Sequence, residues 1–101
     1  VLTSGATVSA GELFVMSMRP LPHVTVVGEA TAGAHSGMLE KTLPNGWRLG
    51  LSNEVITAHD GHVYEKVGIP PDVEVEAGRR TPGSDRDPVL DEALEILAAN
   101  Q

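Results

Sequence analysis

Short apolar runs separated by turn signals dominate the first third of the chain. Val1 to Thr3 form a strand-like run that ends at Ser4-Gly5. The next apolar stretch, from about Ser9 to Met18, leaves almost no polar face, so it predicts a helix that is buried nearly all round. Val24 to Val27 is a short β-branched run, typical of a strand buried on both faces of a parallel sheet. This order predicts a strand–helix–strand crossover.

The middle of the chain predicts a loop followed by a hairpin. Gly28 to Gly37, GEATAGAHSG, is rich in small residues and is typical of a functional loop. Met38 to Leu43 and Trp47 to Ser52 then alternate in polarity around Asn45-Gly46. Asn-Gly between two strand patterns is the strongest short-range hairpin signal.

The following segments are predicted to be extended. Glu54 to Thr57 reads as a further strand, and His62 to Val67 as another extended piece after the Asp60-Gly61 turn. Pro70-Pro71 then precedes Val73 to Val75.

The last part of the chain predicts a linker and a surface helix. Residues 77–86, AGRRTPGSDR, have the composition of a solvated linker. Asp87 and Pro88 stand in the favoured order of a helix N-cap and first position, which predicts a helix over 87–101. One apolar stripe at helical spacing is expected to pack on the domain: Leu90, Ala93, Leu94 and Leu97.

Composition narrows the class of protein. The 101 residues fit one domain, and 41% apolar with 21% charged residues is ordinary for a globular chain. A net charge of −7 argues against nucleic acid or an anionic membrane surface as partner. No apolar run approaches the roughly 18 residues that span a bilayer, so no membrane insertion is expected.

The chain opens at Val1 directly into an apolar strand pattern, without a preceding polar lead. We therefore expect it to be a piece of a larger protein. Such a piece would expose a sheet edge and an apolar helix, so we expect it to associate with a missing N-terminal half or to form an oligomer.

A metal site is not expected. His59 and His62 lie three residues apart beside Asp60, but they flank an apparent turn and have no third ligand at a recognisable spacing. With no cysteine, thiolate ligands are excluded. The pattern indicates neither a metal nor another cofactor.

Ser9 has two possible roles, as a helix cap or as a nucleophile. Ser9 and Glu12 have the S-x-x-E spacing of a capping box, which the spacing alone favours. The same helix start also offers free N–H groups to a negative charge, as a nucleophile needs. No histidine or lysine lies close in sequence to act as its base, so the residues alone leave both readings open.

Four segments, in order, carry a resemblance to a known family: SGATVSAGE, VTVVGEATAG, LPNGWRLGLS and YEKVGIPPDVEV. Together they resemble the carboxy-terminal processing proteases, a family that includes the tail-specific proteases, the tricorn core proteases and the interphotoreceptor retinoid-binding modules. The resemblance implies an α/β fold, a fragment of the crotonase-like ββα superhelix with a β-hairpin and a C-terminal amphipathic helix. Residues 1–76 would form the C-terminal half of a serine peptidase catalytic domain.

The resemblance also implies roles for individual residues. Ser9 would be the nucleophile of peptide-bond hydrolysis through an acyl-enzyme, and the N–H of Ala10 would be one oxyanion-hole donor. Glu65 of YEKVGIPPD would orient the catalytic apparatus; the other reading is a solvated strand carboxylate. From their place in the glycine-rich loop, and not from the resemblance, Gly33 and His35 are expected to bind substrate; the other interpretation of His35 is a solvated loop histidine.

The general base is not in the expected place. One branch of the family uses a lysine after the T-x-G of this loop, but here Ala34 follows Thr31-Ala32-Gly33. The loop looks more like the tricorn and retinoid-binding branch, in which a histidine from the missing N-terminal half is the base. We therefore expect the 101 residues alone to be inactive.

Two other functions stay open from the sequence. One is a non-catalytic module on the same fold that binds a hydrophobic ligand, and the other is a fragment whose serine only caps its helix. For the peptidase, the partner is a peptide or protein substrate, and the resemblance implies an extracytoplasmic location, periplasmic or secreted.

Overall fold

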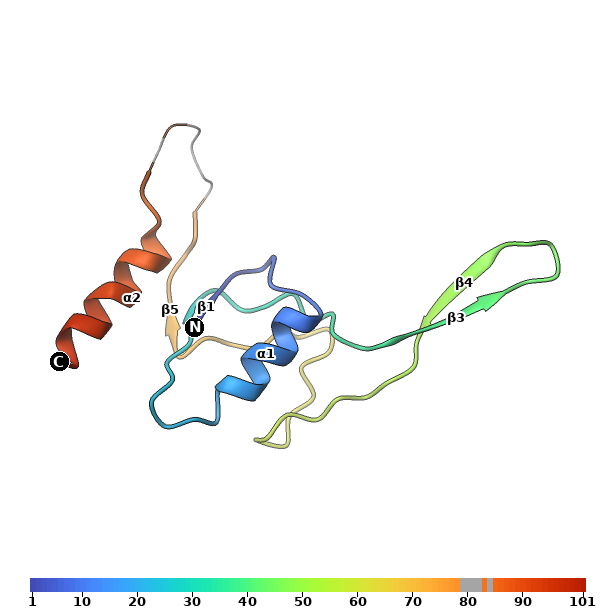
Figure 1. Ribbon diagram of the computed structural model, residues 1–101, viewed down its shortest axis with the longest axis horizontal. Helices are drawn as coiled ribbons and strands as arrows, with labels where there is room; N and C mark the ends of the chain where they lie inside the picture. Colours follow the sequence, from blue (N-terminus) through green and yellow to red (C-terminus); the bar gives the residue numbers. More distant parts are fainter. Residues whose placement is uncertain (79–82, 84) are drawn as a thin grey trace.

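The computed structural model describes residues 1–78, 83 and 85–101 as a mixed α/β domain with two helices and two small sheets (Figure 1). In chain order the elements are β1 (Leu2–Thr3), α1 (Ala10–Met18), β2 (Val27–Gly28), β3 (Met38–Thr42), β4 (Arg48–Ser52), β5 (Val73–Glu74) and α2 (Pro88–Ala99). The molecule measures 59 × 37 × 17 Å, because the β3–β4 hairpin extends away from the rest. Among the described residues, no helix has the length and apolar character needed to cross a bilayer.

The parallel sheet confirms the predicted strand–helix–strand unit. β2 lies between β1 and β5, and both pairings are parallel. Leu2 pairs with Val27, and Val27 pairs with Val73. Because all three strands run in one direction, their carboxyl ends meet at one edge of the sheet. The segments that follow β1 and β2 leave from that edge.

The predicted hairpin is confirmed, but the strand predicted after it is wrong. β3 and β4 pair antiparallel, and every residue of both strands is exposed. Residues 54–57 form no strand, because nothing lies beside them in register; Glu54 instead donates its N–H to the Ser36 hydroxyl at 3.2 Å. Within the predicted extended piece 62–67, residues 65–67 form a turn.

The core is small, and this corrects the prediction for the first helix. It centres on Val15, Val26, Tyr64 and Ile69. The predicted bounds of α1 are confirmed, but the helix buries only Glu12 and Val15. Phe14 is 55% exposed, because Val26, Tyr64 and Ile69 pack only against the side of the helix that carries Val15.

The C-terminal helix packs on the sheet as predicted, but of the predicted stripe only Ala93 lies on the packed side. Asp87 accepts a hydrogen bond from the Leu90 N–H at 3.2 Å, and Pro88 is the first helical residue, as predicted. Val89 is buried, and Ala93 and Ile96 are half-buried on the same side. The predicted leucine stripe, Leu90, Leu94 and Leu97, is exposed instead. Two apolar stripes run side by side on this helix, and the one with Val89, Ala93 and Ile96 faces the sheet. Of the predicted linker 77–86, residues 79–82 and 84 lie outside the described residues.

Candidate active site

The carboxyl edge of the parallel sheet gathers the segments that carried the sequence signals. The loop after β2, residues 29–37, is held from two directions. The Ala32 N–H donates to the Thr7 carbonyl at 2.9 Å, next to the start of α1, and the Lys66 N–H donates to the Gly33 carbonyl at 2.7 Å. This loop therefore joins the N-terminal end of α1 to the turn that follows Tyr64.

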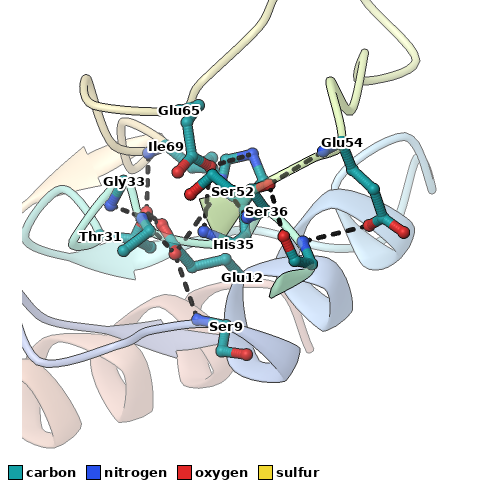
Figure 2. A network of polar contacts seen from close by, with 12 residues as sticks. Ser9, Glu12, Thr31, Gly33, His35, Ser36, Ser52, Glu54, Glu65 and Ile69 are labelled. Atoms are coloured by element: carbon teal, nitrogen blue, oxygen red, sulfur yellow. Dashed lines mark hydrogen bonds and ion pairs between the residues drawn. The ribbon is translucent and has the colours of Figure 1, made fainter. Parts of the chain in front are cut away.

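Glu12 is the centre of the polar contacts at this edge (Figure 2). Its side chain is fully buried and accepts four hydrogen bonds. These come from the Thr31 hydroxyl at 2.6 Å, the Gly33 N–H at 2.7 Å, the Ala34 N–H at 2.8 Å and the Ser9 N–H at 3.2 Å. One carboxylate thus binds the loop to the helix start.

The protonation of Glu12 follows from these contacts. Burial by itself raises the pKa of this carboxyl, because it disfavours the charged form. The hydrogen bonds from Thr31, Ala34 and Gly33, with a smaller contribution from the charge of His35, outweigh burial and lower the pKa below its usual value. Glu12 is therefore an ionised carboxylate at neutral pH.

Ser9 has a strained backbone. Its φ is 54° and its ψ is −121°, a region that residues with a side chain rarely adopt. The surroundings hold this conformation: the Ser9 N–H faces the Ala34 carbonyl at 2.9 Å as well as Glu12, and the Ser9 carbonyl accepts from the N–H of Glu12 and of Leu13. Strain of this kind costs about 1–3 kcal/mol and gathers at functional sites.

The Ser9 hydroxyl does not cap the helix by a hydrogen bond. Ser9 and Glu12 are placed as a capping-box pair. The Glu12 carboxylate accepts a hydrogen bond from the Ser9 N–H, as this motif requires. The Ser9 side chain lies near the Glu12 N–H but makes no cap hydrogen bond to it; that N–H donates to the Ser9 carbonyl at 2.9 Å. Asp87 shows the contrast, since it caps α2 with an ordinary φ of −122° and a side-chain hydrogen bond. In Figure 2 the Ser9 hydroxyl points away from the carboxylate cluster.

Ala10 presents a free donor beside this hydroxyl. Its N–H is one of the first of the helix, where no intrahelical acceptor exists. In the described part of the chain this N–H donates to no acceptor. Ala10 is also exposed, so a substrate oxygen can reach the donor.

Glu65 and His35 meet on the other side of Glu12. The Glu65 carboxylate accepts from the N–H of His35 at 3.1 Å and of Ser36 at 3.0 Å, and 27% of its side chain is exposed. The His35 ring is fully buried between two carboxylates, with Nδ1 3.6 Å from Glu12 and Nε2 3.6 Å from Glu65. Among the described residues, the Ser9 hydroxyl makes no hydrogen bond to a histidine or to Glu65. The substrate-binding role of His35 stays a prediction.

Gly33 is buried where the loop meets the following turn. Both of its backbone groups are used, the N–H by Glu12 and the carbonyl by the Lys66 N–H. Its φ is +73°, and a Cβ there would lie 2.7 Å from the Gly68 nitrogen and 2.8 Å from the Val67 nitrogen. These contacts fix the loop within the chain. The contact between Gly33 and substrate stays a prediction.

Replacing Gly33 by alanine is expected to cost more stability than the same change at an open turn. Gly61 is the matched control, because its φ is +83° and nothing lies within 4 Å of its Cβ position. Gly61→Ala should cost about 1 kcal/mol from the backbone conformation alone. Gly33→Ala adds a backbone clash and should cost at least about 1 kcal/mol more. Urea unfolding measures both, and equal losses would contradict this account of the loop.

The far end of α1 carries a second polar cluster. The Arg19 guanidinium donates to the Tyr64 hydroxyl at 3.0 Å, and that hydroxyl donates to Asp60. The hydrogen bond from Tyr64, followed by that from the His62 N–H, lowers the pKa of Asp60 to about 2. A cavity of about 250 Å³ lies here, but neither Ser9 nor Glu65 lines it. Within the described residues, no group of three or more His, Asp or Glu side chains could hold a metal ion.

Sequence reasoning missed Thr31 and underrated Glu12. Glu12 was assigned only to a capping box, yet it is the sole charged residue within α1, a signal that it has a buried partner. Thr31 accepts from the Ile69 N–H at 2.8 Å while it donates to Glu12, so it fastens the loop to the segment before β5. Nothing in its local pattern indicates this contact.

Comparisons with known proteins place this arrangement in a family. Residues 1–75 match peptidase family S41. A candidate peptidase from Parabacteroides merdae is 34% identical, with a TM-score of 0.85 over 100% of this chain and 32% of its own. The tricorn protease is 27% identical, with a TM-score of 0.81 over 98% of this chain and 10% of its own. A lipoprotein from Streptococcus agalactiae is also 27% identical, with a TM-score of 0.73 over 99% of this chain and 31% of its own.

The chain thus spans about a third or less of the length of these three proteins. No curated protein matches it. The resemblance seen in the four sequence segments is confirmed by the family match and by the similar structures, among them the tricorn protease. The chain belongs to peptidase family S41, and so to a family of hydrolases.

Proposed function

We propose that this chain carries the nucleophile of a serine peptidase of the tricorn type, built on a crotonase-like fold, and that the nucleophile is Ser9. The observation that carries the proposal is the strained backbone of Ser9 at a helix start, together with a hydroxyl that makes no cap hydrogen bond. Strain kept in place by several hydrogen bonds is typical of a functional residue. A serine on a sharp turn into a helix is also how other hydrolases expose a nucleophile.

The surroundings of Ser9 support a defined reaction. The Ser9 oxygen attacks the substrate carbonyl carbon, and its proton passes to a general base. The tetrahedral oxyanion is stabilised by the free N–H of Ala10 and by the positive end of the α1 dipole. The amide C–N bond then breaks, and the leaving amine takes the proton from the base. Water hydrolyses the acyl-enzyme in the same way and restores the serine.

Glu65 is proposed to orient the catalytic groups. Two backbone N–H groups hold its carboxylate, and part of the side chain remains exposed. A carboxylate fixed in this way can align a base or a water molecule that enters from outside the described residues.

The base and the second oxyanion donor are proposed to come from polypeptide outside the 101 residues. Ala34 stands where a lysine base would be expected, and no histidine side chain in the described part of the chain bonds to the Ser9 hydroxyl. The similar proteins are about three times longer or more, and the exposed apolar residues of α1 and the hairpin offer a surface for such polypeptide. The isolated chain is therefore proposed to be inactive and to associate with a further segment or a second copy. Its substrates are proposed to be peptides or proteins.

An extracytoplasmic location, periplasmic or secreted, is also part of the proposal. The similarity to a lipoprotein from Streptococcus agalactiae supports it.

A fluorophosphonate probe tests the proposal on the full polypeptide that contains this chain. We expect one covalent adduct, located on Ser9 by peptide mass spectrometry. Ser17→Ala is the matched control, because Ser17 lies exposed on the same helix and only donates to the Leu13 carbonyl; this variant should label normally. An intact fold with no adduct, or an adduct on another serine, would overturn the proposal. The first result would favour the hydrophobic-ligand module instead.

A further inference from the structure

The His35 side chain is buried without any hydrogen bond. Neither ring nitrogen makes a hydrogen bond, although the side chain is fully enclosed. Buried polar atoms in proteins nearly always make a hydrogen bond, so two buried nitrogens without one on the same ring are unusual. Both face carboxylates rather than apolar groups: Glu12 from α1 lies 3.6 Å from Nδ1, and Glu65 from the following turn lies 3.6 Å from Nε2.

The chemistry of the imidazole and the two carboxylates decides which group can donate a hydrogen bond and which can accept one. A carboxylate only accepts hydrogen bonds, whereas an imidazole nitrogen donates when it carries a proton. The ring therefore separates two negative charges and can offer an N–H to either of them. No other titratable side chain among the described residues is within ion-pair distance of this ring.

All described contacts to the Glu65 carboxylate come from one short stretch of the loop. They are the His35 N–H, the Ser36 N–H and the His35 ring. Glu12 binds the same loop through the N–H groups of Gly33 and Ala34. The ring is the only side chain among the described residues that lies against both carboxylates, so it joins the helix start that bears Ser9 to Glu65.

We propose that His35 is a positioning residue, which holds the Glu65 carboxylate in its working orientation through Nε2 while Nδ1 keeps the ring against Glu12. It need not touch the substrate. The inference rests on the proposed function, because it assigns Glu65 a place in that reaction.

Three substitutions separate positioning from simple filling of space. A glutamine amide nitrogen can take the place of Nε2 and reach Glu65, whereas the shorter asparagine takes the place of Nδ1 and reaches only Glu12. Leucine fills the space without a donor. In the full polypeptide, His35→Gln should keep kcat for peptide hydrolysis within about 5-fold. His35→Asn and His35→Leu should lower kcat about 10- to 100-fold with little change in KM, because a misplaced catalytic group costs rate rather than binding.

Hydrogen exchange gives a readout that does not depend on catalysis. The Ser36 amide donates to Glu65, so its exchange reports whether the carboxylate stays in place. After correction for intrinsic rates, we expect this amide to exchange about 10-fold faster in the Asn and Leu variants and at the wild-type rate in the Gln variant. The amide of Leu43, which donates to the Trp47 carbonyl at 2.7 Å at the far end of the hairpin, is the internal control and should not change.

The two proposals fail in different ways. Wild-type protein without Ser9-dependent hydrolysis would sink the proposed function but leave the exchange result to decide the role of His35. Equal Ser36 exchange in all three variants would overturn the positioning role. So would activity that follows only the melting temperature of the variants, since that is the signature of space filling.

Discussion

Alanine in place of Ser9 is expected to lower the rate of peptide hydrolysis by roughly 10⁴- to 10⁶-fold while the fold is kept. The rate falls because no other group in the described chain can supply the nucleophilic oxygen at this helix start. Stability should change by less than about 0.5 kcal/mol, because the lost hydroxyl makes no hydrogen bond. Single-turnover kinetics and urea unfolding of the full polypeptide measure the two effects.

Glycine at the same position adds a second, opposite effect. A φ of 54° is strained for serine and accessible to glycine, so Ser9→Gly should be inactive yet more stable by about 1 kcal/mol. A gain of stability with a loss of activity indicates a functional residue whose conformation lowers the stability of the fold. If instead Ser9→Ala lost about 1 kcal/mol of stability and Ser9→Gly gained none, Ser9 would be a helix cap and the nucleophile would lie elsewhere.

Removal of the Glu12 carboxylate is expected to be the most destabilising single change on this helix. Glu12→Ala leaves three donors without their acceptor, the Thr31 hydroxyl and the N–H groups of Gly33 and Ala34, and it opens a buried cavity. The cost should be about 3–5 kcal/mol. Glu12→Gln should also destabilise, because at either oxygen position an amide NH₂ would have to face a backbone N–H. Chemical denaturation at pH 7 measures both, and Glu95→Gln on the exposed side of α2 is the neutral control.

The same carboxylate makes stability depend on pH with a defined sign. The pKa of Glu12 is lowered in the folded state relative to its ordinary value of 4.5. Its contribution is therefore complete above about pH 4.5, and it is lost as the pH falls through the lower, folded-state pKa. The Glu12→Gln variant should show a flatter fall in stability below pH 4.5 than the wild type. Parallel curves for the two proteins would show that another group controls acid unfolding.

The local elements were predictable because their signals are local. Asn45-Gly46 set the hairpin, and Asp87 with Pro88 set the start of α2. The hydrophobic pattern could not show which apolar face of each helix packs against the rest of the domain. α1 is apolar on nearly all sides and yet exposes Phe14, and α2 buries Val89 rather than Leu90, because each helix has a packing partner on one side only.

The site was partly visible in the sequence. Ser9 and Glu65 were predicted from the family resemblance, and their spacing alone did not distinguish them from a cap and a solvated carboxylate. The strain at Ser9 is a tertiary effect, since it depends on the Ala34 carbonyl and on Glu12 together. The burial of His35 between two carboxylates likewise depends on loop contacts that no periodicity records.

The length of α1 has a further consequence. Its first turn reaches Glu65 through Glu12 and the His35 ring, and the residue after its last turn, Arg19, reaches Tyr64, the neighbour of Glu65. Each residue of a helix adds about 1.5 Å and 100° of rotation. An insertion or deletion of one residue inside α1 would turn one anchor away from its partner. The helix is thus a spacer of fixed length, and we expect length variation in the hairpin turn rather than in α1.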